Sequence, residues 1–166
     1  MIIINDKQIQ ICPVETPEEM DYLNRSFAAD DFQLYINDSP SASDYLLFKH
    51  NQQNVGCFSI NYTTSFGVRA CNPIIYVSNR VFSVLCILKM FQYIFTKLEV
   101  DKISFVVFAH NTPCLLALKK MRIHCDGELK YYREYNDCHI SCYVFSILPE
   151  EYASLRERVN NYFNGC

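Results

Sequence analysis

The chain reads DKISFVVFAHNTPCLLALKKMRIHCDGELKYYREYNDCHISCYVFSILPEEY from residue 101 to residue 152, and this stretch contains the clearest succession of predicted elements. Residues 102–109 form a continuous apolar run, which is typical of a strand in the middle of a covered sheet. Residues 111–120 predict a short helix, in whose first turn Pro113 is tolerated. Residues 124–148 predict two late strands. The stretch therefore indicates a sheet built from alternating strands and helices.

The segment near the N-terminus predicts a strand and a helix. Residues 8–14 alternate between polar and apolar and predict a first strand. A helix is expected next, because Thr16 can serve as its N-cap, Pro17 suits the first helical position and Glu19 completes a capping box. The apolar residues at helical spacing along this helix are Met20, Leu23 and Phe27.

The middle of the chain predicts a meander followed by a buried helix. Residues 30–43 pass from a short helix into a polar loop. Two β-rich runs, at 44–50 and 54–64, predict a hairpin, and residues 70–77 predict a further strand. Residues 81–98 predict a largely buried helix, since polar side chains occupy only one of its faces. The tail predicts an amphipathic closing helix, whose apolar face would carry Tyr152, Leu155, Val159 and Tyr162.

These elements follow the order βααβββαβαββα. The order predicts an α/β fold with a mixed central sheet of about seven strands flanked by helices. At 166 residues, half of them hydrophobic, the chain is long enough to bury one sizeable core. We therefore expect residues 1–166 to form a single domain.

The charge and hydropathy of the chain argue against several classes of partner. The net charge of −3 gives no basic field for a phosphate backbone, so we expect no nucleic-acid partner. No apolar stretch approaches membrane length, because Lys89 and Gln92 interrupt the longest one, and the N-terminal apolar run is too short for a signal peptide. The sequence thus predicts a cytoplasmic protein with no membrane partner.

The nine cysteines are scattered, odd in number and mostly flanked by apolar residues. They predict small core side chains in a reducing compartment rather than a disulfide scaffold. Cys138 and Cys142 bracket His139, but a zinc site would need a second pair of ligands at comparable spacing. We therefore expect no metal.

A pattern of small and polar residues follows the central strand. Asn111-Thr112-Pro113-Cys114, followed by Leu118-Lys119-Lys120-Met121-Arg122-Ile123, resembles a motif of the GNAT superfamily of acyl-CoA-dependent N-acyltransferases. That motif is an Asn, two variable residues and a small residue, then a helix ending in a Glu-Lys-Leu-Gly-Phe type sequence. Here Lys119 stands at the Glu position and Arg122 at the Gly position. Gly127 and Asp137 are similar to the branch that contains ribosomal-protein N-terminal and sugar-nucleotide N-acetyltransferases.

The resemblance implies the GNAT fold, with acetyl-CoA or another acyl-CoA as co-substrate. It places the family's pyrophosphate loop, Arg/Gln-x-x-Gly-x-Gly/Ala, on Ser78, Asn79, Arg80, Val81, Phe82 and Ser83. Valine supplies a backbone N–H as glycine does, but its Cβ limits close approach, which Arg80 could offset by pairing with phosphate. The alternative is an ordinary turn, in which Ser78 or Asn79 caps the helix and Arg80 is solvated.

The resemblance also implies how the thioester is held. Asn111 would bond the pantetheine amides, or only cap the short helix, or do both. The thioester carbonyl would be polarised by a backbone N–H of the strand before the loop. The residues nearest to that position are Ile75, Tyr76 and Val77.

Proton transfer needs a base and an acid. A primary amine of pKa about 10 is mostly protonated at neutral pH, so a base must take its proton. His110, at the end of the central strand, has a suitable intrinsic pKa, and Tyr76 is the alternative. The family's general acid, a tyrosine, corresponds to Leu118, so that role is unfilled. Cys114 could donate a weak S–H bond to the leaving thiol, or be only a small core residue.

The acceptor side offers several candidates. Tyr131, Tyr132 and Tyr135 could wall a pocket or be structural residues of an edge strand, and Glu15 and Asp44 are candidate carboxylates. The acidic net charge tolerates a basic acceptor, so we expect a small-molecule or peptide amine.

Taken as a whole, the resemblance predicts an N-acyltransferase that moves an acetyl or other acyl group from acyl-CoA to a primary amine by direct attack on the thioester. The alternative is a non-catalytic binding or regulatory protein of the same fold. A homodimer is compatible with either.

Overall fold

The computed structural model describes residues 9–28, 44–135 and 137–164. The chain divides into two compact units, one within Met1–Thr63 and Cys71–Glu99 and the other within Thr64–Ala70 and Val100–Cys166. The predicted helix and polar loop of residues 30–43 lie outside the described residues. Within the described ranges, no helix is long and apolar enough to cross a membrane. The single domain expected from the sequence stays a prediction.

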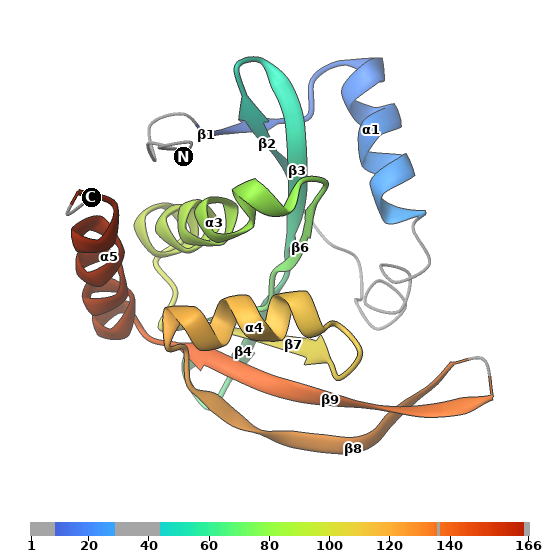
Figure 1. The fold of residues 1–166 in the computed structure, drawn as a ribbon, viewed down its shortest axis with the longest axis vertical. Coiled ribbons are helices and arrows are strands. Elements are labelled where there is room, and N and C mark those ends of the chain that lie inside the picture. Colours follow the sequence, from blue (N-terminus) through green and yellow to red (C-terminus); the bar gives the residue numbers. More distant parts are fainter. Residues whose placement is uncertain (1–8, 29–43, 136, 165–166) are drawn as a thin grey trace. The chain divides into compact units, whose positions relative to one another are not determined.

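The first unit contains an antiparallel sheet of four strands (Figure 1). In sheet order these are β1 (Ile9–Pro13), β2 (Asp44–His50), β3 (Gln53–Ile60) and β6 (Ile74–Val77). The predicted hairpin is β2–β3. Asn51 and Gln52 join its strands, and their positive φ angles of 48° and 66° are those of a tight two-residue turn.

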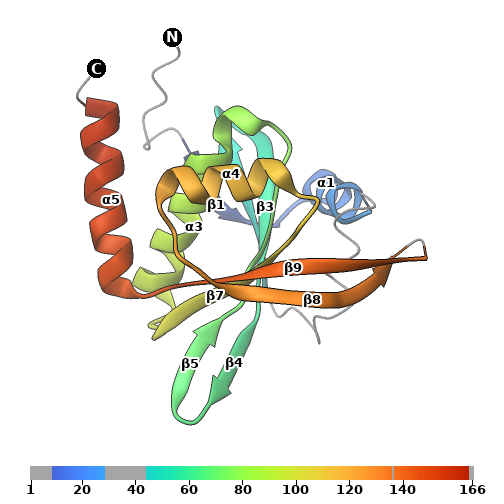
Figure 2. The same cartoon turned by 60° about the horizontal axis from the view of Figure 1, so that its bottom comes forward.

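The two faces of this sheet pack against different helices, α1 (Pro17–Phe27) and α3 (Ser83–Lys97) (Figures 1 and 2). On one face, Leu23 of α1 packs with Leu47 and Cys57. On the other face, the ring of Phe58 meets that of Tyr93 of α3, with centroids 6.1 Å apart. Cys57 thus lies on the α1 face and Phe58 on the α3 face, because neighbouring residues of a strand point to opposite faces of its sheet.

Helix α1 begins as the sequence predicts. The Glu19 N–H donates to the Thr16 hydroxyl at 3.2 Å, and the Thr16 N–H donates to the Glu19 carboxylate at 3.1 Å. Glu19 also forms an ion pair with Lys49, and the hydrogen bond from Lys49 is the main reason why the pKa of the Glu19 carboxyl falls to about 2. The capping box is thereby joined to strand β2.

The buried side of α1 is rotated from the expected one. Leu23 is buried, but Met20 is 46% exposed. Glu19 and Ser26 are buried instead, because the capping carboxylate and the ion pair with β2 occupy the side facing the sheet. The side chain of Phe27 lies outside the described part of the chain.

The second sheet has five strands in the order β4-β5-β7-β9-β8. Their bounds are β4 (Tyr62–Ser65), β5 (Val68–Cys71), β7 (Lys102–Phe108), β9 (Cys138–Ile147) and β8 (Cys125–Tyr135). Strand β7 lies in the middle, as its apolar run predicts, and Phe105 stacks on Phe145 of β9 with centroids 5.6 Å apart. Helices α4 (Thr112–Met121) and α5 (Pro149–Asn164) belong to the same unit.

Two runs expected to be single strands are each divided. The run 54–64 breaks at Asn61, which separates β3 from β4, and the run 70–77 breaks at Asn72-Pro73, which separates β5 from β6. Pro73 has no N–H for a ladder, and the Asn72 N–H donates to the Asn61 carbonyl at 2.7 Å. The described residues therefore form nine strands in two sheets, where the order of elements predicted about seven strands in one.

Candidate active site

Strand β6 presents backbone N–H groups at the free edge of the first sheet. The Ser78 N–H donates to the Val55 carbonyl of β3 at 3.0 Å. Because N–H groups alternate in direction along an antiparallel strand, the Tyr76 N–H also points toward β3, whereas those of Ile75 and Val77 point away from it. In the described part of the chain, β6 is the last strand of this sheet on that side. Of the three residues expected near the thioester carbonyl, Ile75 and Val77 therefore offer an N–H at the edge.

Gly56 fixes how closely β6 approaches β3. It lies opposite Val77 in the strand register. A Cβ at this position would lie 2.5 Å from the Tyr76 carbonyl oxygen and 3.2 Å from the Val77 Cα, closer than the 3.4 Å at which ordinary van der Waals contact begins. The missing side chain thus determines where the edge N–H groups lie.

The expected pyrophosphate loop follows β6 directly and contains the 3₁₀ turn η2 (Arg80–Phe82). Asn79 caps this turn, because its Oδ1 accepts a hydrogen bond from the Val81 N–H and its carbonyl accepts one from the Phe82 N–H, both at 3.0 Å. The Ser83 N–H donates to the Arg80 carbonyl. Three of the five N–H groups from Asn79 to Ser83 are therefore used inside the loop, and an anion would first meet those of Asn79 and Arg80.

The side chains of this loop divide between solvent and the sheet. Arg80 is exposed, and so is Val81, to 55%. Ser78 is tied to the sheet, since its hydroxyl donates to the Val55 carbonyl at 2.9 Å. The ring of Phe82 packs against that of His50, with centroids 4.8 Å apart. Arg80 is thus accessible to a phosphate, while the hydroxyl of Ser78 is already bonded to β3.

Tyr76, expected as a base, lies on the α1 face of the sheet. Its register partner is Cys57, and it packs with Tyr22 of α1 against the buried cluster that contains Cys57. The edge N–H groups belong to its two neighbours on the strand. Three consecutive residues of β6 therefore present different groups. Ile75 and Val77 offer backbone N–H groups at the edge, and Tyr76 places its phenol on the α1 face.

Sequence reasoning missed Tyr22. Its hydroxyl is buried, and burial raises the pKa of Tyr22, an effect that the nearby hydroxyls of Ser78 and Ser26 oppose. The Ser26 hydroxyl donates to the Tyr22 carbonyl at 2.9 Å. The available signal was spacing: Tyr22 is three residues after Glu19 and four before Ser26, so all three lie on one side of the helix.

In the second unit, His110, Asn111 and Cys114 lie where β7 ends and α4 begins. Asn111 caps α4, since its Oδ1 accepts a hydrogen bond from the Cys114 N–H at 3.3 Å. This confirms the capping role and uses the amide oxygen rather than the nitrogen. Burial raises the pKa of the Cys114 thiol to about 11, so the thiol keeps its proton at neutral pH. Leu118, which the sequence resemblance aligns with a tyrosine, is 1% exposed and belongs to the core.

The imidazole of His110 lies against an aromatic side chain of β7. The exposed imidazole stacks on Phe108, with centroids 5.8 Å apart and an angle of 12° between the rings. Phe108 in turn lies 6.2 Å from Tyr132 of β8. Phe108 therefore contacts both His110 and Tyr132, which is one of the three tyrosines expected to wall an acceptor pocket.

Tyr131, the other tyrosine whose side chain the structure describes, lies in a bulge of β8. Leu129 pairs with Cys142 and Arg133 with Ile140, so β8 has three residues between these pairs where β9 has one. Tyr131, within the bulge, has a φ of 52° and is 74% exposed. Its ring meets His139 edge-on at 5.2 Å. The side chains of Tyr135 and Asp44 lie outside the described residues, and Glu15 is exposed beside the capping box.

The described cysteines are free thiols, and those that are buried are Cys57, Cys71, Cys86 and Cys142. Among the side chains that the structure describes, no group of three or more His, Cys, Asp or Glu could hold a metal ion. In the first unit, the described groups that could bind a co-substrate are therefore backbone N–H groups and the guanidinium of Arg80.

Neither a family model nor a curated protein matches the sequence, but solved structures match the fold. A spermidine N-acetyltransferase from Vibrio cholerae in complex with CoA and spermine aligns over 89% of this chain and 99% of its own, with 16% identity and a TM-score of 0.72. The V. cholerae spermidine/spermine N-acetyltransferase SpeG in complex with manganese ions aligns over 90% and 97%, with 16% identity and a TM-score of 0.71. A chimera of SpeG and hSSAT aligns over 88% and 99%, with 15% identity and a TM-score of 0.71.

These likenesses extend over nearly the whole chain and confirm the predicted α/β fold. They do not support the narrower resemblance to the ribosomal-protein and sugar-nucleotide branch, since the matched proteins act on spermidine. The chain therefore has the fold of the matched spermidine N-acetyltransferases.

Proposed function

We propose that this protein is an N-acetyltransferase that moves an acetyl group, or another acyl group, from acyl-CoA to a primary amine. The observation that carries the proposal is the likeness to a spermidine N-acetyltransferase bound to CoA and spermine, over 89% of this chain. The edge of β6 supports it, because Ile75 and Val77 offer N–H groups on the strand that leads into the expected pyrophosphate loop.

Backbone donors suit this chemistry. As the amine nitrogen bonds to the carbonyl carbon, negative charge develops on the thioester oxygen, and the C–S bond then breaks to release CoA. An N–H of Ile75 or Val77 would hold that oxygen. Strand β6 is fixed by its ladder with β3, so such a donor needs no rearrangement during the reaction.

The pyrophosphate of the co-substrate would bind at Ser78–Ser83. The N–H groups of Asn79 and Arg80 and the exposed Arg80 guanidinium are the donors that this loop offers to an anion. Phe82 and Ser83 would contribute by holding the turn, and Val81 would limit the approach. The amide nitrogen of Asn111 would bond the pantetheine arm.

The proton-transfer roles follow from the surroundings of each candidate. His110, whose exposed ring stacks on Phe108, is the proposed base, with Tyr76 as the alternative. Cys114 is poorly matched to the role of acid. Its pKa of about 11 exceeds that of an ordinary thiol, about 8.5, so it would not give its proton to the leaving thiolate. It could still donate a hydrogen bond to that sulfur.

The acceptor is proposed to be a small cationic amine. The matched V. cholerae enzyme binds spermine, which makes a polyamine the first acceptor to test, with peptide amines next. The net charge of −3 favours the approach of a cation. A cytoplasmic location and a homodimer remain predictions that accompany this proposal.

A second candidate function is a non-catalytic binding or regulatory protein with the same fold. Three observations favour it: the loop uses three of its N–H groups internally, Leu118 lies where the family has its tyrosine, and Ser78 lacks the family's basic charge. Each of these features would weaken co-substrate binding or proton transfer while leaving the fold intact.

A binding and turnover experiment separates the two functions. Wild-type protein should show saturable thermal stabilisation by acetyl-CoA and should release free CoA when spermidine is added. Arg80→Gln should weaken the binding of acetyl-CoA by about tenfold or more, because a charge-assisted bond is lost. Lys97→Gln, at the far end of α3, is the matched control and should bind as wild type does.

The outcomes are distinct. Stabilisation by acetyl-CoA without turnover on polyamines, peptide amines or other primary amines would support the non-catalytic function. No stabilisation at millimolar acetyl-CoA or other acyl-CoA would refute both the acetyltransferase proposal and the proposed loop.

A further inference from the structure

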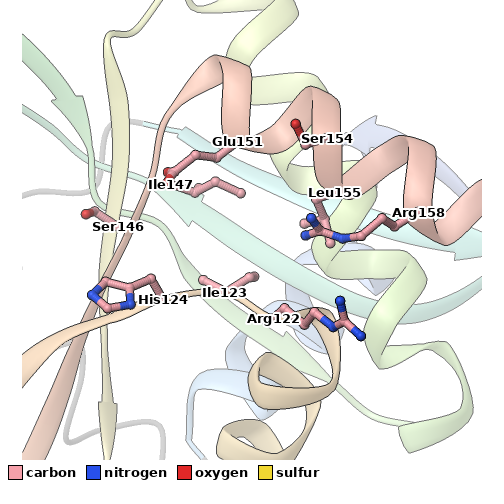
Figure 3. Close-up of a pocket in the computed structure, with 9 residues that line it drawn as sticks. All are labelled: Arg122, Ile123, His124, Ser146, Ile147, Glu151, Ser154, Leu155 and Arg158. Atoms are coloured by element: carbon pink, nitrogen blue, oxygen red, sulfur yellow. The ribbon is translucent and has the colours of Figure 1, made fainter.

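A hollow of about 270 Å³ lies in the second unit, lined by the turn after α4, the end of β9 and the first turns of α5 (Figure 3). Ile147 in its wall pairs with Ile103 at the beginning of β7, whereas His110 and Asn111 follow the other end of that strand. The hollow is therefore separate from the residues of this unit that the proposed acetyl transfer uses.

Arg122 enters this hollow from a strained backbone position. It ends α4 in the left-handed conformation, with φ 58° and ψ 35°, and its N–H bonds to the carbonyls of Leu118 and Lys119. Glycine is the usual residue at such a helix end, because it has no Cβ to clash. An arginine kept in this conformation points to a use for its side chain.

Two arginines lie at one end of the hollow without an acidic partner. Figure 3 shows the guanidinium groups of Arg122 and Arg158 on the same side. Neither forms an ion pair with any side chain that the structure describes. The Arg158 guanidinium donates one long hydrogen bond, of 3.5 Å, to the Met121 carbonyl. Most of the N–H donors of this pair are therefore open to a ligand.

The carboxylates of Glu151 and Asp126, near the hollow, each accept a hydrogen bond from a neighbouring residue. Glu151 in its wall accepts a hydrogen bond from the Leu148 N–H at 2.9 Å, at the beginning of α5. Asp126 accepts one from the hydroxyl of Ser146 at 2.5 Å. Each acid accepts its printed hydrogen bond from an uncharged local donor, and among the described residues neither forms an ion pair with Arg122 or Arg158, so both guanidinium groups keep their donors for a ligand.

The floor of the hollow is apolar. It consists of Ile123, Ile147 and Leu155, of which the last two are buried (Figure 3). A site that combines an apolar floor with a few placed polar groups is typical of small-molecule binding, and its volume falls below the roughly 300 Å³ at which sites for drug-sized ligands begin.

We infer that this hollow binds a small organic oxyanion, with a carboxylate or phosphate on Arg122 and Arg158 and a short hydrocarbon body on the apolar floor. Planar guanidinium groups match either oxyanion through paired N–H bonds. The site does not depend on acetyl transfer, so its ligand is a candidate effector rather than a substrate.

Three probes separate the contributions of charge and hydrocarbon. The methyl signals of Ile123, Ile147 and Leu155 are followed by NMR on the full chain during titration. Isovalerate should shift them saturably, and isovaleramide, which has nearly the same shape but no charge, should bind at least about tenfold more weakly. Inorganic phosphate carries charge without a hydrocarbon body and should also bind more weakly than isovalerate.

Equal binding of isovalerate and isovaleramide would overturn the role of the arginines. Phosphate binding as tightly as isovalerate would overturn the role of the apolar floor. The absence of any shift with all three probes would overturn the site.

Two variants test the arginines directly. Arg122→Gly removes the guanidinium and puts the favoured residue at the left-handed position, so the protein should fold at least as well as wild type. Arg158→Gln removes the other charge. Each should weaken isovalerate binding by about tenfold or more. Arg156→Gln, an exposed arginine of α5 outside the lining, is the control and should bind as wild type does. Unchanged binding in Arg122→Gly, with wild-type stability, would contradict the inference.

Discussion

Replacing Gly56 by alanine tests whether the spacing of β3 and β6 positions the edge N–H groups of β6. The new Cβ would lie 2.5 Å from the Tyr76 carbonyl oxygen, and ordinary contact begins at 3.4 Å, so the strand must move by about 0.9 Å, the difference between these distances. The side chain of Phe48 and the Cα of Val77, both at 3.2 Å, restrict other movements. Overpacking of this kind costs about 1 to 3 kcal/mol, which corresponds to a decrease in Tm of roughly 2 to 12 °C for a chain of this length.

The assay compares thermal melts of Gly56→Ala and Gly127→Ala. The second variant is a matched control, because a Cβ at Gly127 would have no other atom within 4 Å, and its Tm should lie within about 2 °C of wild type. Where acetyl transfer is measurable, Gly56→Ala should lower kcat by about 100-fold, because a displacement near 1 Å misplaces the donor to the carbonyl oxygen. A Gly56→Ala protein that melts and turns over as the control does would refute the reasoning.

Three further predictions follow from single groups. Because the pKa of Glu19 is about 2 in the folded protein and about 4.5 otherwise, the stability that this carboxylate adds is present above pH 4.5 and is lost as the pH falls toward 2. Glu19→Gln should be less stable than wild type at pH 7 in urea unfolding, and the difference should shrink across that range; a constant difference would contradict the ion pair. At pH 7.5, iodoacetamide should modify exposed Cys125 and Cys138 and spare Cys114, whose pKa of about 11 keeps it a thiol. Peptide mass mapping checks this, and equal rates would show that Cys114 is accessible and ionised. Val81→Gly should lower the Kd for acetyl-CoA in calorimetry, since it removes a Cβ and keeps the N–H; a Kd equal to that of wild type would argue against pyrophosphate at this loop.

The elements that could be predicted from the sequence depend on residues close together in the chain. The capping box of α1 joins Thr16 and Glu19, and the cap of α4 joins Asn111 and Cys114, each across three residues. Such contacts form whatever the rest of the fold does, so local patterns are enough to predict them.

Features set by distant neighbours could not be predicted in this way. The breaks at Asn61 and Asn72 depend on a hydrogen bond between two strands, and the bulge at Tyr131 depends on the register with β9. Which of Ile75, Tyr76 and Val77 present an N–H at the edge depends on the register of β6 with β3, because a shift by one residue reverses which N–H groups face the edge.

The cap that Asn79 places on η2 has a consequence for the empty state of the loop. A glycine-rich phosphate loop holds several backbone donors open, and these are satisfied only by water until the anion arrives. Here the side-chain oxygen of Asn79 already occupies the Val81 N–H. An anion at that donor would replace one acceptor by another, and the hydrogen bond to Asn79 would keep the shape of the loop without a ligand.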